Sequence, residues 1–295
     1  MRAKKILESA REHLYALKGE VFDVLSISQP SSVEEVRNLA KIISKLSPLM
    51  GNLIEFKTTE FLNSKMSEDC CGKWMRQDPG FPDVVFDGDG NPIPGFEIKA
   101  WFPFATEITG RFKDSVKRFK GDMIDLVILA WLPEHLFWGK PRIIDVCVVS
   151  GKSVAQARDL HYHKPPHYLV IEPENTANRT ANLQQTNTNG YVIQDSSGSG
   201  LRKATQIVES WGRGGTSYST KTAYQERLKD LMGKVKYRLD TNYAKIDRIE
   251  HEGIEAFKRK VLQSEIDGRS IKAWGTVIGN LPVSVANDLL YISGN

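Results

Sequence analysis

The most informative stretch of this 295-residue chain is FPDVVFDGDGNPIPGFEIKAW, residues 81–101. Its two ends, residues 83–86 and 96–101, are rich in β-branched and aromatic side chains, which favour strands. The residues between them are mostly Gly, Asp, Asn and Pro, which are typical of turns. The pattern therefore predicts a β-hairpin, and its apolar content indicates that one side of the hairpin faces a core.

This hairpin brings three charged side chains to one place. Side chains alternate along a strand, so Glu97 and Lys99 share a face, and Asp83 reaches that face if the two strands pair. Paired carboxylates are hard oxygen ligands for Mg²⁺, which can polarise a phosphate oxygen and lower the pKa of a bound water. Lys99 is expected either to stabilise charge on a pentacovalent phosphate or to orient or deprotonate the attacking water.

The combination of Pro82-Asp83 with Glu97-Ile98-Lys99 resembles the signature of the PD-(D/E)XK nuclease superfamily, and in particular its type II restriction endonucleases. The resemblance implies a mixed β-sheet flanked by helices and a Mg²⁺-dependent hydrolysis of phosphodiester bonds. The expected products carry 5′-phosphate and 3′-hydroxyl ends. The similarity covers about residues 50–150 of the chain.

The same resemblance implies an additional carboxylate from the helix that precedes the hairpin. The matching stretch is GNLIE, residues 51–55, which makes Glu55 the first choice and Glu60 the second. Members of this class act as two-fold homodimers on palindromic DNA, so the resemblance also implies a homodimer with one site for each strand.

The rest of the chain reads as alternating helices and strands. A capping box at Ser32 and Glu35 starts a helix, Pro48 is expected to break it, and another helix starts near residues 51–52. Residues 70–80 read as irregular. Further segments are helices at 106–120 and 153–160, strands at 126–131, 143–149 and 168–171, and a charged helical pattern at 221–262. This alternation predicts an α/β core with a mixed sheet.

We expect a single endonuclease domain, residues 1–295, made of three parts. Residues 1–65 form a helical N-terminal part, residues 66–173 the catalytic α/β core, and residues 174–295 the DNA-recognition loops and C-terminal helices. No internal repeat or clear linker divides the chain.

Composition narrows the class of protein further. The residues AVILMFWYC make up 40% of the chain, which is typical of a globular protein, and the net charge is only +4. The most apolar run, residues 123–132, is too short to cross a bilayer. Three cysteines without a CxxC spacing argue for a reducing, cytoplasmic location and against structural zinc. The phosphate-binding GxxxxGK[ST] and hydrolase GxSxG motifs are absent.

Two basic or amide-rich regions are candidate DNA contacts. The segment from residue 99 to 121 has six basic and two acidic residues, so it is either a phosphate-binding helix or an ordinary solvated helix face. The segment from 175 to 189 is either a base-reading segment or a polar surface loop, since Asn and Gln can pair with adenine and Arg with guanine. The candidate residues in these two segments are Lys113, Lys117, Lys120, Arg179, Asn182, Gln184, Gln185, Asn187 and Asn189. Gly- and Ser-rich loops further along the chain add Arg202, Lys203 and Arg213 as candidates for contacts with the DNA backbone or base edges.

The sequence therefore predicts a sequence-specific endonuclease for double-stranded DNA that uses Mg²⁺. Two alternatives stay open: a repair or recombination nuclease that recognises DNA structure, and a DNA-binding protein of the same fold without catalysis. The intact trio of Asp83, Glu97 and Lys99 argues against the second alternative, because a pure binder does not need it.

Overall fold

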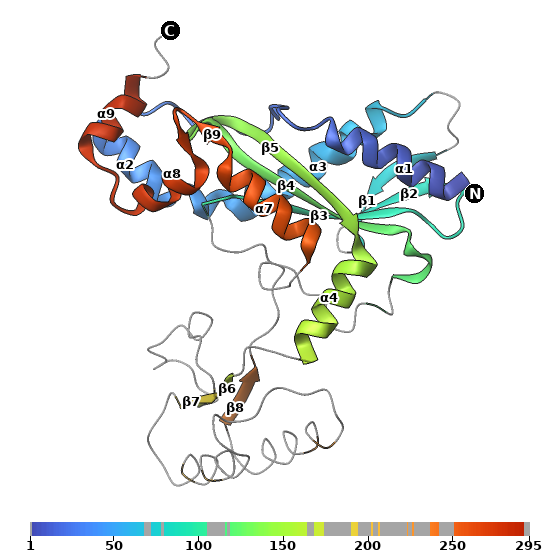
Figure 1. Cartoon of the computed structure of the whole chain (residues 1–295). Helices are drawn as coiled ribbons and strands as arrows, with labels where there is room; N and C mark the ends of the chain where they lie inside the picture. Colours follow the sequence, from blue (N-terminus) through green and yellow to red (C-terminus); the bar gives the residue numbers. More distant parts are fainter. Residues whose placement is uncertain are drawn as a thin grey trace. The chain divides into compact units, whose positions relative to one another are not determined.

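The computed structural model describes residues 2–67, 72–77, 80–104, 116, 119–163, 168–173, 190–193, 202, 206, 223, 226, 237–241 and 251–291 (Figure 1). The chain divides into two compact units. Unit 1 consists of Met1–Gly110, Ser115–Ala155 and His251–Asn295, and unit 2 consists of Arg111–Asp114 and Gln156–Glu250. Each unit is described by itself below.

Unit 1 is built on a five-stranded mixed sheet with the strand order β1-β2-β3-β4-β5. β3 and β4 are parallel, and the other neighbours are antiparallel. This arrangement confirms the expected α/β class with a mixed sheet. The strands are β1 (Gly72–Arg76), β2 (Val84–Gly88), β3 (Gly95–Trp101), β4 (Ile124–His135) and β5 (Trp138–Ser150).

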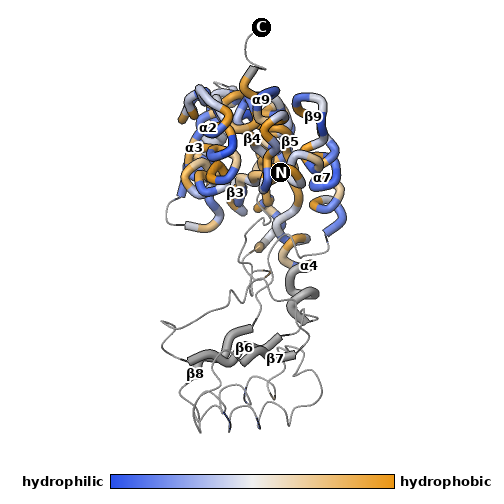
Figure 2. The backbone as a smooth tube through the Cα atoms, turned by 90° about the vertical axis from the view of Figure 1, so that its left-hand side faces the viewer, coloured by the Kyte–Doolittle hydropathy of each residue, from blue (hydrophilic) through white to orange (hydrophobic). Residues whose placement is uncertain are grey.

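Helices cover both faces of this sheet. α3 packs against β1 and β3, whereas α7 packs against β5, and Figure 2 shows the two helices on opposite sides of the strands. The helical elements of unit 1 are α1 (Arg2–Tyr15), α2 (Val33–Ile42), η1 (Ile43–Leu46), α3 (Ser47–Ser64), η3 (Lys120–Asp122), α7 (Glu252–Gln263), α8 (Ile271–Val277), η7 (Ile278–Asn280) and α9 (Val283–Tyr291). α4 (Gly151–His163) begins in unit 1 and ends among the residues of unit 2. A small antiparallel pair, β9 (Glu265–Ile266) and β10 (Arg269–Ser270), follows α7.

The core of unit 1 is centred on β4, where every residue from 125 to 133 is buried. A strand that is covered on both faces needs a continuous apolar run instead of an alternating one, and LVILAWL meets that need. Under α3, the ring of Trp74 packs against Phe86 and Phe96, with ring centroids 5.3 and 4.9 Å apart. These contacts fix β1, β2 and β3 to one another.

Several details of unit 1 test the sequence predictions. The hairpin is confirmed, because β2 and β3 pair antiparallel through Val84 with Phe96 and Val85 with Gly95. The predicted boundary near Pro48 is present, because α2 ends at Ile42 and α3 begins at Ser47. The start predicted at residues 51–52 was too late, since Pro48 occupies the first turn of α3, where a missing N–H costs nothing. Residues 72–76 were predicted to be irregular but form the edge strand β1.

Unit 2 contains a three-stranded sheet with the order β7-β6-β8. The strands are β6 (Tyr168–Pro173), β7 (Gly190–Ile193) and β8 (Tyr237–Thr241), with β6 parallel to β7 and antiparallel to β8. The predicted strand at 168–171 is confirmed, whereas the helical pattern assigned to 221–262 is wrong at β8. The predicted helix at 153–160 corresponds to α4, and most of the one at 106–120 lies outside the described residues. Within the described part of the chain, no helix is long and apolar enough to cross a membrane.

Candidate active site

The candidate site forms where β2 and β3 separate. Their pairing covers only two residue pairs, Val84 with Phe96 and Val85 with Gly95, and β3 then continues to Trp101. Beyond this pairing, Asp83 Oδ2 accepts the backbone N–H of Ile98 at 2.7 Å, a group that a neighbouring strand would otherwise bind. The Pro-Asp dipeptide therefore ends the pairing of the two strands and places a carboxylate beside β3.

Lys99 joins the two predicted carboxylates. Its Nζ lies 2.6 Å from Glu97 Oε1 and 3.1 Å from Asp83 Oδ2, and it also donates to the carbonyl of Ile98 at 3.1 Å. The three charged side chains are 12 to 24% exposed. The structure thus brings Asp83, Glu97 and Lys99 together in the way that the alternation of side chains along β3 predicts.

Burial and charge act against each other in this cluster. Burial raises the pKa of Glu97, and the charge of Asp83 raises it further, while Lys99 opposes both effects. Burial lowers the pKa of the Lys99 ammonium, but the two carboxylates outweigh that effect, so its pKa lies above the ordinary value. Lys99 is consequently protonated at neutral pH in this arrangement.

Glu55 approaches the cluster from α3. Its Oε1 lies 2.5 Å from Arg76 Nε, and its side chain is 14% exposed. Burial raises the pKa of Glu55, Arg76 lowers it, and the charges of Asp83 and Lys99 also act on it. Glu60, the second choice from the sequence, instead pairs with Lys57 at 2.7 Å on an exposed part of α3.

The carboxylates offer a coordination set that suits Mg²⁺. Oε2 of Glu97 is buried and has no hydrogen-bond partner among the described atoms, an arrangement that a bound cation would satisfy. Mg²⁺ characteristically uses one or two carboxylates and keeps several waters or substrate oxygens, so Asp83 and Glu97 suffice as protein ligands. The described residues contain no group of three or more His, Cys, Asp or Glu side chains that could hold a metal ion.

Sequence reasoning missed two residues of this region, Arg76 and Asn52. Arg76 ends β1, and its Nη2 lies 3.3 Å from Asn52 Oδ1 on α3. The one signal in the sequence was a charged residue at the end of GKWMR, a segment that was not predicted to be a strand.

Most of the predicted DNA contacts lie outside the described residues: Lys113, Lys117, Arg179, Asn182, Gln184, Gln185, Asn187, Asn189, Lys203 and Arg213. Of the two others, Lys120 is the first residue of η3, and Arg202 is a helical, exposed position. The assignment of these residues to phosphate or base contacts therefore stays a prediction.

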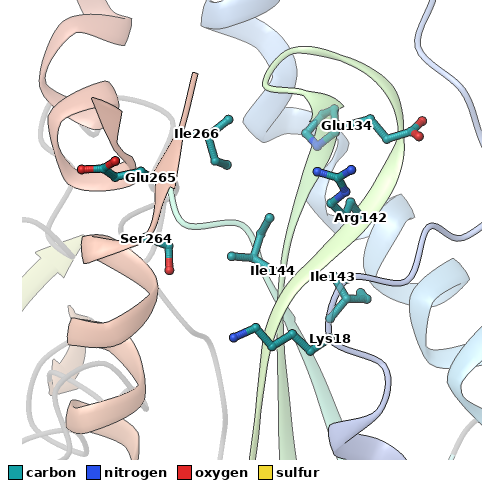
Figure 3. Close-up of a pocket in the computed structure, with 10 residues that line it drawn as sticks. Lys18, Glu134, Arg142, Ile143, Ile144, Ser264, Glu265 and Ile266 are labelled. Atoms are coloured by element: carbon teal, nitrogen blue, oxygen red, sulfur yellow. The ribbon is translucent and has the colours of Figure 1, made fainter. Parts of the chain in front are cut away.

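A cavity of about 370 Å³ opens elsewhere in unit 1. It lies between the β4–β5 hairpin and the segment 264–266, where Figure 3 shows Arg142 and Glu134 on one side and Ser264 and Ile266 on the other. None of the four candidate catalytic side chains lines this cavity, so the hairpin site and the cavity are separate features.

No protein-family model, curated protein or solved structure matches this chain. The function is therefore inferred from the side chains gathered at the open edge of β3. The chemistry they support is the binding of a divalent cation next to a fixed ammonium group.

Proposed function

We propose that this protein is a Mg²⁺-dependent, sequence-specific endonuclease for double-stranded DNA, of the type II restriction class and with the PD-(D/E)XK fold. The observation that carries the proposal is the convergence of Asp83, Glu97 and Lys99, which come from the two ends of one hairpin. The five-stranded mixed sheet with helices on both faces also agrees with the family resemblance.

Each residue has a distinct part in the proposed hydrolysis. Asp83 and Glu97 would hold Mg²⁺, which would polarise a phosphate oxygen and lower the pKa of a coordinated water. Lys99 either stabilises the developing charge on the phosphate or orients or deprotonates the attacking water. Glu55, at the border of the cluster, orients or completes the site.

The substrate class follows from this chemistry together with the resemblance. A partly buried trio of two carboxylates and an ammonium is costly to fold unless its charges are used or neutralised. Phosphodiester hydrolysis uses them, because the reacting group is an anion that binds both the cation and Lys99. The homodimer and the reading of a particular base sequence are expectations from the family resemblance.

The decisive experiment is cleavage of plasmid and phage DNA by the purified protein with Mg²⁺ and with EDTA. We expect discrete bands with Mg²⁺ only, and none from Asp83→Asn or Glu97→Gln. Asp87→Asn is the matched control, because Asp87 is an exposed carboxylate on the same strand, away from the cluster. Calorimetric titration with Mg²⁺ should show binding that Glu97→Gln loses.

Other results would redirect or reject the proposal. A smear of products, or cutting only at junctions and damaged DNA, would support a nonspecific or structure-dependent nuclease. Tight DNA binding without cleavage would support a non-catalytic binder. Full activity in Asp83→Asn would contradict the assignment of the site.

A further inference from the structure

One arginine stands beside the proposed site and is held on two sides by α3. Arg76 Nε lies 2.5 Å from Glu55 Oε1, and Arg76 Nη2 lies 3.3 Å from Asn52 Oδ1. The amide nitrogen of Asn52 donates to the carbonyl of Pro48 at 3.2 Å, so its oxygen is the atom that faces Arg76. Two contacts to neighbouring turns of one helix fix the orientation of the planar guanidinium.

The strand register places this arginine at the same end of the sheet as Asp83. Arg76 is opposite Val84 on β2, and Val84 is opposite Phe96 on β3, so the three residues form a row across the sheet. Asp83 immediately precedes Val84 and Glu97 immediately follows Phe96, so these two side chains alternate with the row and point away from the face that Arg76 shares with it. Glu55 links Arg76 to the cluster, because it pairs with Arg76 and its pKa responds to the charges of Asp83 and Lys99. The backbone N–H of Gln77 also donates to the carbonyl of Asp83 at 2.7 Å, which ties the end of β1 to the start of β2.

The charge balance of the cluster gives this arginine a role. With all groups ionised, the net charge is −2. It comes from three carboxylates and one ammonium, those of Glu55, Asp83, Glu97 and Lys99. Such a site repels a phosphodiester. Arg76 reduces the negative charge to −1, and one bound Mg²⁺ then makes the site positive.

We propose that Arg76 is a further substrate-binding residue of this site, and that Glu55 and Asn52 hold its guanidinium where it binds a phosphate oxygen next to the scissile bond. Arginine suits this task because its fork of N–H donors matches phosphate geometry. On this view one function of Glu55 is to position Arg76. The inference rests on the proposed nuclease function.

The test compares Arg76→Gln, Arg76→Lys and Glu55→Gln with the wild type. Arg76→Gln keeps an N–H donor for Glu55 but removes the cation, and circular dichroism melts check that it folds. The substrate is a duplex that carries the cleavage site found by sequencing the ends of plasmid digests. KM and kcat are measured with Mg²⁺, and the salt dependence of binding to a fluorescein-labelled copy is measured in EDTA. Lys73→Ala, a cation removed from the exposed face of the same strand, is the control.

We expect Arg76→Gln to lower kcat/KM on the order of 10- to 100-fold, chiefly through KM. It should also reduce the slope of log K against log salt by about 1, which corresponds to one lost phosphate contact. Arg76→Lys should restore the slope and part of the KM, and Lys73→Ala should leave kcat/KM unchanged.

The possible failures can be told apart. If the wild type does not cleave DNA, or Asp83→Asn cleaves as well as the wild type, the proposed function fails and the inference falls with it. If Asp83 is essential but Arg76→Gln keeps the wild-type KM and salt slope, only the inference is overturned. Equal losses of kcat in Arg76→Gln and Glu55→Gln with an unchanged slope would also overturn it, because Arg76 would then act only through Glu55.

Discussion

Asp83 and Lys99 are joined through a single carboxylate oxygen, since Asp83 Oδ2 accepts both Lys99 Nζ at 3.1 Å and the backbone N–H of Ile98 at 2.7 Å. The backbone contact fixes the carboxylate, and the carboxylate in turn fixes the ammonium. The geometry of the candidate site is therefore set by the end of the pairing between β2 and β3.

Replacing Lys99 by Met should remove the ammonium while keeping most of the side-chain volume. We expect cleavage to fall on the order of 10²- to 10³-fold, because one fixed charge that stabilises the transition state is lost. The variant should also melt at a lower temperature than the wild type in EDTA, since Asp83 and Glu97 then repel each other without a cation. Melts with added Mg²⁺ should recover part of this loss, and a variant with wild-type cleavage would exclude the proposed role.

Asp125 is a fully buried carboxylate that pairs with Arg11. It lies on β4, and its two oxygens bind Nε and Nη2 of Arg11 on α1, the latter at 2.7 Å. We expect Asp125→Asn to destabilise the protein by about 3 kcal/mol, the lower end of the range for a broken buried pair, because Arg11 is 36% exposed. Urea unfolding measures this change.

Two variants make the Asp125 prediction specific. Glu8→Gln, which breaks an exposed pair with Lys4 on the same helix, should cost less than about 1 kcal/mol. The double variant Arg11→Met with Asp125→Leu should lose less stability than Asp125→Asn alone, because no unpaired charge is left buried. If the double variant and Asp125→Asn lose the same stability, the unpaired charge of Arg11 does not account for the destabilisation.

Asn63 satisfies the backbone of the edge strand β1. Its side chain accepts the N–H of Trp74 at 2.7 Å and donates to the carbonyl of the same residue at 2.9 Å, as a neighbouring strand would. We expect Asn63→Ala to cost about 1–3 kcal/mol and to promote self-association through the uncovered edge. Urea unfolding and light scattering test both effects. Ser64→Ala, at the exposed end of the same helix, should change stability by less than about 0.5 kcal/mol.

His251 should make the stability of unit 1 depend on pH. Its Nδ1 caps α7 by accepting the N–H of Ile254 at 3.4 Å. Its Nε2 lies 2.9 Å from Ser153 Oγ, which itself donates to Ser150, so the neutral ring carries its proton on Nε2. Burial lowers the pKa of His251 below the ordinary value of about 6.5. Protonation thus favours the unfolded chain, and stability is lost as the pH falls from about 6.5 through the folded-state pKa.

The measurement for His251 is urea unfolding at pH 7.5 and pH 5. His251→Asn keeps a good helix cap but has no titrating group, so it should lose less stability between these two pH values than the wild type does. An identical loss in both proteins would assign the pH dependence to other groups.

The parts of this structure that sequence alone predicted depend on short-range patterns. Asp83, Glu97 and Lys99 could be assigned because the two-residue period of a strand fixes which side chains share a face. Arg76 could not, because its contact with Glu55 bridges 21 positions and depends on how α3 packs on β1. The edge strand β1 was missed for a related reason: only Trp74 of its five residues is buried, so GKWMR carries little hydrophobic signal.

The contact between Ser153 and His251 has a consequence for folding. It joins residues on either side of Gln156–Glu250, so α7 can dock on β5 only after that long segment of chain has been closed into a loop. Each doubling of loop length raises the free-energy cost of closing the loop by about 0.6 kcal/mol, because the closed chain has less conformational entropy. A segment that becomes compact before α7 docks acts as a shorter loop and lowers the cost. The order in which the two units fold should therefore determine how fast α7 covers its face of the five-stranded sheet.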